Sequence, residues 1–158
     1  MDTPIVNVIG AGLAGSEAAF QLARHGIRVR LFEMRPVRMT EAHSTGLFGE
    51  LVCSNSLRNI SLETAVGILK EEMRRLGSIV LTVADRARVP AGAALAVDRE
   101  EFARGLTEAL SADPMIEIVR AEVTALPPGP TIVASGPLTR PALAADLDRL
   151  IGSRNLYF

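Results

Sequence analysis

Residues 5–33 of this chain read IVNVIGAGLAGSEAAFQLARHGIRVRLFE. The apolar run Ile5–Ile9 is typical of a strand that is buried on both faces of a sheet. The spacing of apolar and small residues in Leu13–His25 predicts a helix, and Gly26 follows as the expected left-handed cap. Ile27–Phe32 alternates in polarity and predicts a second strand. Strand, helix and strand within about 30 residues indicate a βαβ unit.

The turn of this unit carries the pattern G-x-G-x-x-G at residues 10–15. In such a turn, Gly10 permits a tight bend, Gly12 lets a pyrophosphate approach the backbone, and Gly15 lets the helix pack closely on the strand. The helix then offers unpaired N–H groups and the positive end of its dipole to the phosphates. The residues expected to contact a dinucleotide pyrophosphate are Gly10, Ala11, Gly12, Leu13, Ala14 and Gly15. The competing interpretation is that these glycines serve packing alone.

An acidic residue, Glu33, follows the second predicted strand, about 20 positions after Gly12. A carboxylate at this place can accept hydrogen bonds from both ribose hydroxyls, whereas an arginine would suggest a 2′-phosphate. Glu33 therefore favours FAD or NAD. The segment TIVASGP (residues 131–137) predicts a strand that ends at Gly136, where the backbone can approach the cofactor a second time. This strand and the long polar connection after Glu33, which leaves room for an isoalloxazine, favour FAD over NAD.

The composition limits the class of protein. A length of 158 residues suits one domain, and a formal net charge of -1 gives no global signal for nucleic-acid binding. A single cysteine excludes an internal disulfide and fits a reducing compartment. We find no cationic leader and no run near the ~20 apolar residues of a membrane span, so a cytoplasmic location is expected. No His/Cys/Asp cluster has metal-ligand spacing, and no metal is expected.

Beyond the βαβ unit, the sequence predicts alternating helices and strands. The expected elements are a helix over 61–76 capped by Ser61, a strand over 79–84, an extended segment ending at 97, a helix from Asp98, extended runs over 115–119, 121–126 and 131–135, and a helix capped by Thr139 and ending at Gly152. The apolar residues expected to face the core are Leu62, Ala65, Val66, Leu69, Met73 and Leu76, then Phe102, Leu106 and Leu110, then Leu143, Leu147 and Leu150. A new apolar run is expected to start at residues 155–158.

Five further segments occur in a fixed order: FEMRP (32–36), LVCSNSLRN (51–59), AVGILKEEMRRLGS (65–78), VPAGAALAVDREEF (89–102) and IVASGPLT (132–139). Together with the glycine turn, they resemble the N-terminal part of the folate- and FAD-dependent tRNA (uracil-5-)-methyltransferase family (TrmFO). The resemblance implies an α/β, Rossmann-like FAD/NAD(P)-binding fold of the glutathione-reductase type, incomplete at the C-terminus. Residues 1–158 would form the N-terminal part of the FAD-binding domain, with a flavin-side connection over about 34–60. Members are more than twice as long, so the other FAD, folate and tRNA parts are expected beyond Phe158.

The resemblance also implies a reaction. The family transfers a methylene group from 5,10-methylenetetrahydrofolate to C5 of a uridine in the tRNA T-loop, and reduced FAD, replenished by NAD(P)H, supplies the electrons that give 5-methyluridine. By the same resemblance, Cys53 would be the catalytic thiol that handles the methylene or faces the redox step. Ser54 and Asn55 would line the isoalloxazine, and Gly136 would contact the cofactor. The nucleophile that attacks uracil is expected beyond Phe158.

Several interpretations stay open at this point. Cys53 is either a reactive thiol near a flavin or a small buried apolar residue. The arginines at 24, 28, 30, 35 and 38 form either a basic patch for tRNA or a solvated face, and His25 and His43 are expected at the surface. Two other functions compete with the family reading: a generic FAD- or NAD-dependent oxidoreductase acting on a small molecule, and an inactive nucleotide-binding remnant.

Overall fold

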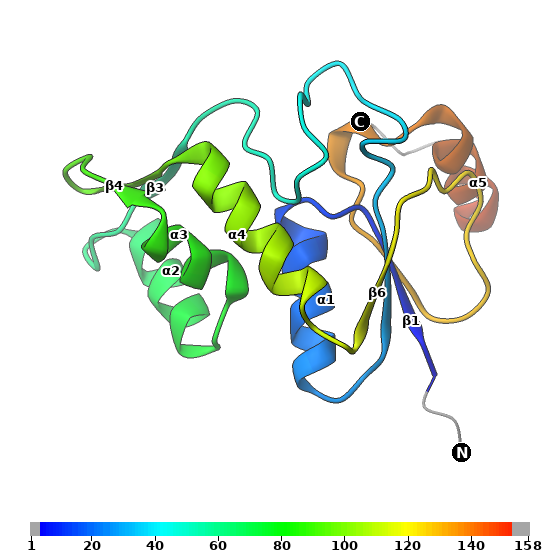
Figure 1. Ribbon diagram of the computed structural model, residues 1–158, viewed down its shortest axis with the longest axis horizontal. Helices are drawn as coiled ribbons and strands as arrows, with labels where there is room; N and C mark the ends of the chain where they lie inside the picture. The colour runs from blue at the N-terminus through cyan, green and yellow to red at the C-terminus, as the bar shows by residue number, and fades with distance from the viewer. Residues whose placement is uncertain (1–3, 153–158) are drawn as a thin grey trace.

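Four parallel strands form the main sheet of the computed structural model, which describes residues 4–152 (Figure 1). They are β1 (Val6–Ile9), β2 (Val29–Phe32), β6 (Ile116–Val119) and β7 (Thr131–Val133), in the order β6-β2-β1-β7. The chain leaves β1 toward β2 on one side and later returns to β7 on the other side. Ligands of doubly wound sheets bind at such a reversal, beside the carboxyl ends of the strands. The fold thus confirms the expected Rossmann-like class and places its crevice between β1 and β7.

Helices cover both faces of this sheet, because successive strand residues point to opposite faces. On one face, Val8 and Leu31 are fully buried in a cluster that includes residues of α1 (Leu13–Arg24) and α4 (Arg99–Ser111). On the other face, Ile9 packs with Leu143 and Leu147 of α5 (Pro141–Ile151), and Phe32 joins this second cluster. Figure 1 shows α5 and α1 on opposite sides of the strands.

A smaller antiparallel sheet lies at the far end of α4 (Figure 1). Its strands are β3 (Ser56–Asn59), β5 (Ala94–Val97) and β4 (Arg88–Val89), in the order β3-β5-β4. It packs with α2 (Ala65–Arg75) and α3 (Ile79–Arg86), and α3 shares the main buried cluster with α1 and α4. The two sheets are therefore joined through one apolar core.

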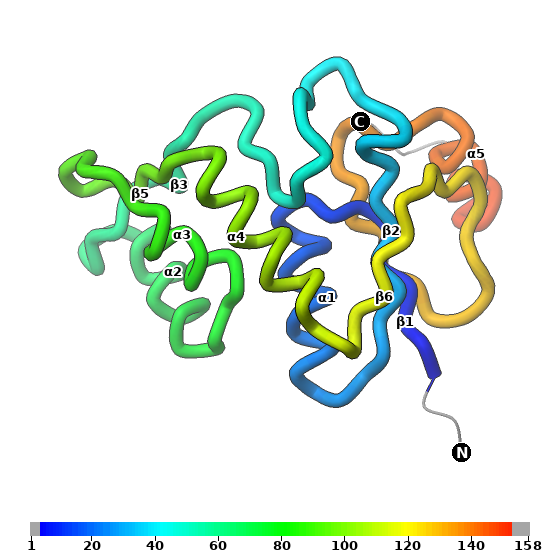
Figure 2. The backbone as a smooth tube through the Cα atoms, in the orientation of Figure 1, coloured from blue at the N-terminus to red at the C-terminus, as the bar shows by residue number. Residues whose placement is uncertain are grey.

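A long loop connects β2 to β3, and Figure 2 shows it arching over the carboxyl ends of the parallel strands. It spans residues 33–55, so β3 occupies the last part of the predicted 34–60 connection. The loop is fixed at several points: the N–H of Phe48 donates to Thr107 Oγ1 of α4 at 2.8 Å, and the N–H of Gly49 donates to the carbonyl of Ala11 at 2.9 Å.

The prediction of a strand over residues 79–84 is wrong, because these residues begin α3. The side chain of Ser78 caps the helix by accepting a hydrogen bond from the N–H of Leu81. Five of the eight helix residues are buried, and the sequence that buries them is a nearly continuous apolar run. Such a run does not distinguish a strand from a fully buried helix.

The prediction for α2 is wrong in its start and in its buried face. Thr64, not Ser61, caps the helix by accepting from the N–H of Gly67. A Cβ atom on Gly67 would lie 1.9 Å from the carbonyl oxygen of Ser61, so this glycine must face the preceding turn. With Gly67 on the inner side, three leucines of the predicted stripe lie outward: Leu62, Leu69 and Leu76 are 63%, 55% and 73% exposed. Met73 does pack against the core, as expected.

Three expectations near the C-terminal end also need correction. Residues 121–126 form no strand, and β7 is half-exposed rather than buried, because within residues 4–152 it pairs only with β1. The N-cap of α5 is Arg140 instead of Thr139, whose hydroxyl donates to the carbonyl of Gly136. Leu150 is 71% exposed, although Leu143 and Leu147 are buried as expected. The predicted apolar run at 155–158 lies outside the described residues.

The helix predicted from Asp98 is confirmed. One carboxylate oxygen of Asp98 accepts hydrogen bonds from the N–H groups of Glu100 and Glu101, and Phe102, Leu106 and Leu110 are fully buried along α4. The strand over 115–119 is confirmed as β6, and Gly26 and Gly152 have the positive φ angles of left-handed caps.

Gly15→Ala is expected to lower the free energy of unfolding by about 3 kcal/mol or more, because backbone has to move to admit the methyl group. An added Cβ would lie 1.8 Å from the carbonyl oxygen of Gly10. The matched control is Gly12→Ala, where no atom lies within 4 Å of the added Cβ and φ is -71°. Urea denaturation should place this control within about 1 kcal/mol of the wild type. Equal destabilisation by both changes would contradict the packing described here.

Candidate dinucleotide-binding site

The three glycines of the turn after β1 have different surroundings. A Cβ on Gly10, whose φ is +97°, would lie 2.7 Å from the carbonyl oxygen of Ala134, and Gly15 has the backbone contact described above. Gly10 and Gly15 are therefore required by packing. Gly12 has open space around the same position. Because no internal contact requires glycine there, Gly12 is the position whose missing side chain leaves room for a ligand.

The N-terminus of α1 faces this open space. Gly12 is its N-cap and provides no side-chain hydrogen bond to the first turn. The leading N–H groups of a helix need external acceptors and carry the positive end of its dipole. Leu13 and Ala14, at the start of α1, line the same cavity as Gly10 and Gly12. A phosphate group could approach these N–H groups without displacing a side chain, because Gly12 has none.

The cavity has a volume of about 390 Å³ and lies at the carboxyl ends of the parallel strands. That volume is in the range of small-molecule sites, about 300–1,000 Å³. Its walls come from the glycine turn, from the end of β2, from the segment after β6 and from the segment after β7. The lining residues outside the glycine turn include Phe32, Glu33, Met34, Arg35, Thr40, His43, Val52, Ala121, Glu122, Val123, Ala134, Ser135, Gly136, Thr139 and Arg140.

Glu33 is a buried carboxylate, with 6% of its surface exposed. Its Oε2 accepts from the N–H of Ala11 at 3.0 Å and from Arg35 Nη2 at 3.2 Å. Its Oε1 accepts from Arg35 Nε at 2.9 Å and from the N–H of Arg35 at 3.0 Å. Burial alone would raise the pKa of Glu33, but the hydrogen bonds and charge of Arg35, with the N–H of Ala11, hold it below its ordinary value. The site thus contains an ionised carboxylate directly behind the glycine turn.

Arg35 also binds a second carboxylate, on the loop above the sheet. Its Nη1 donates to Glu50 Oε2 at 3.1 Å and to the carbonyl of Thr45 at 3.2 Å. Glu50 in turn accepts from both the N–H and the hydroxyl of Ser44 and of Thr45. Burial raises the pKa of Glu50, but these hydrogen bonds outweigh it and lower the pKa to about 2.

Arg120, just after β6, holds the same loop from the opposite side. Its Nη1 donates to the carbonyls of Arg35 and Gly46, both at 2.7 Å, and its guanidinium lies 4.4 Å from the ring centroid of Phe48. Burial lowers the pKa of Arg120, Glu33 raises it and Arg35 lowers it, with a net decrease. The end of β2, the loop and the end of β6 are therefore tied together by charged side chains.

The structure places most of the residues predicted to bind a cofactor around one cavity. Gly10, Gly12, Leu13, Ala14, Glu33 and Gly136 line it. Ala11 contributes its N–H to Glu33, and Gly15 packs behind the turn. The cysteine loop is different. Cys53 is exposed, Ser54 Oγ accepts from the N–H of Ser56, and Asn55 donates to the carbonyl of Val97 in β5. None of these three lines the cavity, although Val52 does.

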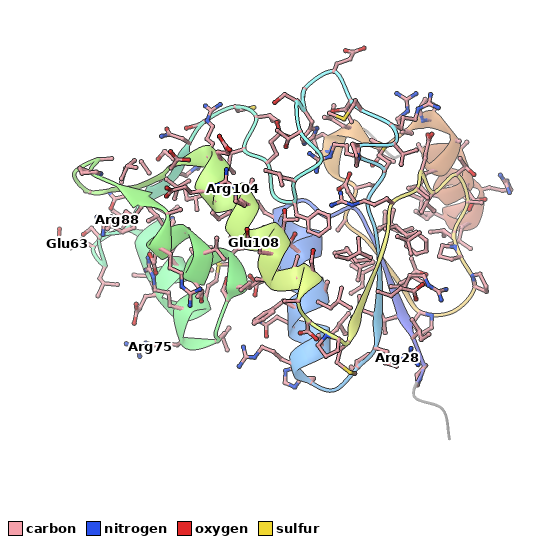
Figure 3. The ribbon with its side chains drawn as sticks, in the orientation of Figure 1. Arg28, Glu63, Arg75, Arg88, Arg104 and Glu108 are labelled. Atoms are coloured by element: carbon pink, nitrogen blue, oxygen red, sulfur yellow. The ribbon has the colours of Figure 1, made fainter. Side chains whose placement is uncertain are left out.

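Of the two interpretations left open for the arginines at 24, 28, 30, 35 and 38, a basic patch gains no support from their contacts. Arg35 is 3% exposed and bound to two carboxylates, Arg30 pairs with Glu117, and Arg38 pairs with Glu122. Arg24 donates to the carbonyls of Leu76 and Gly77. Arg28 precedes β2, and Figure 3 shows it at the edge of the sheet opposite the carboxyl ends. Four of the five arginines are therefore engaged in contacts within the chain.

Sequence reasoning missed the wall formed by Thr40, His43, Ala121, Glu122, Val123 and Arg140. His43 was expected at the surface, but it is only half-exposed and lines the cavity, with Nδ1 2.6 Å from the hydroxyl of Thr40. Burial and the charge of Arg35 lower the pKa of His43, against the opposing charges of Glu50 and Glu33. The position of residues 121–123 in the sequence could have predicted their place in the wall. They follow shortly after a parallel strand, and ligands bind beside the carboxyl ends of such strands.

These features define a Rossmann-like domain of the dinucleotide-binding class. Residues 5–141 match the model of the family described as "Glucose inhibited division protein A", and the chain belongs to this family. Among curated relatives, the chain is 59% identical over all 158 residues to the methylenetetrahydrofolate–tRNA-(uracil-5-)-methyltransferase TrmFO of Halalkalibacterium halodurans, and 57% identical to that of Bacillus cytotoxicus. It spans 36% of the length of each.

Solved structures agree with the fold. The GidA protein of Aquifex aeolicus is 21% identical with a TM-score of 0.63, over 81% of this chain and 21% of that one. The amino acid oxidase NikD is 15% identical with a TM-score of 0.57, over 98% of this chain and 55% of that one. At these identities the likeness concerns the fold alone. Within residues 4–152, no helix has the length and apolar character needed to cross a membrane, and His, Cys, Asp and Glu form no cluster suited to a metal ion.

The Glu50 network predicts a specific pH dependence of stability. The folded-state pKa of Glu50, about 2, is below the ordinary value of 4.5, so folding favours the ionised form. The resulting stabilisation is fully present above the ordinary pKa and is lost as the pH falls from there toward 2. Glu50→Gln should therefore cost about 2–3 kcal/mol at pH 7, and the difference from the wild type should shrink below pH ~4.5. Urea denaturation at a series of pH values measures it; a constant difference down to pH ~2.5 would contradict the assignment.

Proposed function

We propose that this chain is the N-terminal, FAD-binding part of a methylenetetrahydrofolate–tRNA-(uracil-5-)-methyltransferase. The observation that carries the proposal is the open position at Gly12, at the N-terminus of α1 and beside the ionised Glu33. The 57–59% identity to TrmFO relatives over all 158 residues supports the choice among flavoproteins. Since the chain spans 36% of their length, the substrates of the whole protein belong to this proposal.

The residues of the cavity fit the parts of FAD. The pyrophosphate would lie over Gly10–Gly15, with its oxygens accepting from the first N–H groups of α1. The adenosine ribose would bind at Glu33, the acidic residue at the end of the second strand. Gly136, which follows β7 with a φ of +67° and no atom within 4 Å of a built Cβ, would admit the cofactor from the other wall. The flavin would then extend toward the loop over 33–55.

Reduced FAD supplies the electrons that convert a methylene group from 5,10-methylenetetrahydrofolate into a methyl group, with NAD(P)H as the upstream reductant. This chain's own contribution is to bind the cofactor and to place residues around it. We propose Cys53 as the thiol that acts in methylene handling or redox chemistry, with Ser54 and Asn55 beside the flavin. The support is the exposure of Cys53 and its place directly after Val52, which lines the cavity.

The T-loop uridine of tRNA is the proposed acceptor of the methyl group, and the cytoplasm is the proposed location of the protein.

Gly12→Ala is expected to weaken FAD binding by about tenfold or more, because the added methyl group occupies the space that the pyrophosphate needs. Since this change leaves the packing intact, its effect on stability should be small. Quenching of flavin fluorescence on titration with the purified protein measures the affinity. Unchanged FAD binding in a folded Gly12→Ala variant would refute the proposed site.

Cys53→Ala tests the catalytic proposal in a protein that carries this chain together with the remaining length of its relatives. Methyl transfer from 5,10-methylenetetrahydrofolate to tRNA should fall to the background rate, because alanine has no thiolate, while FAD binding persists. The matched control is Ser56→Ala, a change three residues away that leaves the thiol in place. Full methyl transfer by the Cys53→Ala variant would refute the role of this thiol. Flavin-dependent turnover without methylated tRNA would instead favour a generic oxidoreductase.

A further inference from the structure

The Glu33 carboxylate has no spare acceptor position in this structure. A carboxylate offers about four lone-pair positions. Four hydrogen bonds use them: one from the N–H of Ala11, one from the N–H of Arg35, and two from the guanidinium of Arg35. A ribose hydroxyl can reach Glu33 only if one of these bonds yields. The longest is the 3.2 Å contact from Arg35 Nη2 to Oε2.

Arg35 is held independently of Glu33. Its Nη1 donates to Glu50 and to the carbonyl of Thr45, and Arg120 Nη1 donates to the backbone carbonyl of Arg35. Glu50 is itself fixed by four hydrogen bonds from Ser44 and Thr45. With Arg35 only 3% exposed, its guanidinium stays in place if one contact to Glu33 is given up.

We propose that Arg35, anchored by Glu50, is a positioning residue for the nucleotide ribose. It fixes the Glu33 carboxylate beside the glycine turn, and it gives up its Nη2 hydrogen bond to Glu33 Oε2 so that a ribose hydroxyl can donate to that oxygen. This inference rests on the proposed binding of FAD. Arg35 would then contribute to ligand specificity although it lies outside the glycine motif. Glu33 binds the ribose hydroxyls, and Arg35 sets the orientation of the Glu33 carboxylate.

The same geometry accounts for selection against a 2′-phosphate. An arginine near the ribose commonly accommodates that phosphate in NADP-binding domains. Here the charge of Arg35 is already neutralised by Glu33 and Glu50, both within 3.1 Å of its guanidinium nitrogens. A 2′-phosphate would meet the ionised Glu33 instead of an available cation. The site therefore favours free ribose hydroxyls.

The test compares FAD with its analogue that lacks the adenosine 2′-hydroxyl, for the wild type and for Arg35→Lys. We expect the wild type to prefer FAD by about tenfold or more, because a hydrogen bond to a charged group is among the stronger ones. Lysine keeps the charge but cannot reproduce the planar fork, so the preference should drop below about threefold. FAD should lose affinity while the analogue binds almost as before. Flavin fluorescence quenching gives all four dissociation constants.

The matched control is Arg74→Lys, which breaks another two-pronged pair, from Arg74 Nε and Nη2 to Asp85, on α2 and α3. It should keep the wild-type preference. Glu50→Gln provides a second variant if Arg35→Lys does not fold, and it should reduce the preference in the same direction because Arg35 loses its anchor.

The outcomes separate the inference from the proposed function. If the wild type does not bind FAD, the proposed function fails and the inference fails with it. If FAD binds but the Arg35→Lys and Glu50→Gln variants keep the full preference, the inference alone is overturned. Equal weakening of FAD and the analogue also overturns it, because that is the signature of a purely structural role.

Discussion

The approach of α1 to the end of β1 depends on two positions where the backbone leaves no room for a Cβ atom. At Gly15 the helix touches the carbonyl of Gly10, and at Gly10 the turn touches the backbone after β7. These contacts bring three segments together: the turn after β1, the first turn of α1 and the segment after β7. The sheet order β6-β2-β1-β7 then leaves the crevice at this point of closest contact. The cavity is thus a consequence of packing, and Gly12 is the one glycine of the three that packing does not require.

A second constraint holds the walls of the cavity. The side chains of Glu33, Arg35, Glu50 and Arg120 connect the end of β2, the long loop and the end of β6. Buried charges are costly unless they are paired and hydrogen-bonded. Glu33, Arg35 and Glu50 are paired with one another and hydrogen-bonded, and Arg120 donates to two backbone carbonyls. Removing one partner would leave the others uncompensated. The loop over 33–55 has no regular secondary structure, but these charged side chains fix its conformation. It can therefore form a defined wall of the cavity.

Local rules predicted the βαβ unit well, because its turn, helix cap and strands are encoded by neighbours in sequence. The helix from Asp98 was predicted for the same reason. The errors arose where tertiary contacts decided. The buried face of α2 is set by Gly67 against Ser61. In Ile79–Ala84 five of the six residues are buried, and so many apolar residues obscure the periodicity that marks a helix. In the site, the position of Glu33 was predicted but its partners were not, because a loop that folds back through Arg35 and Glu50 leaves no periodic trace in the sequence.

The outer side of β7 has a further consequence. Within residues 4–152, this strand pairs with β1 alone, and Ile132 and Val133 are each more than one-third exposed. An edge strand presents a row of free backbone donors and acceptors beside its side chains. In the doubly wound order, the next strand is added on this side of the sheet. The β7 border is therefore a template for one more strand, and whichever segment pairs with it would shield both side chains and extend the wall beside Gly136.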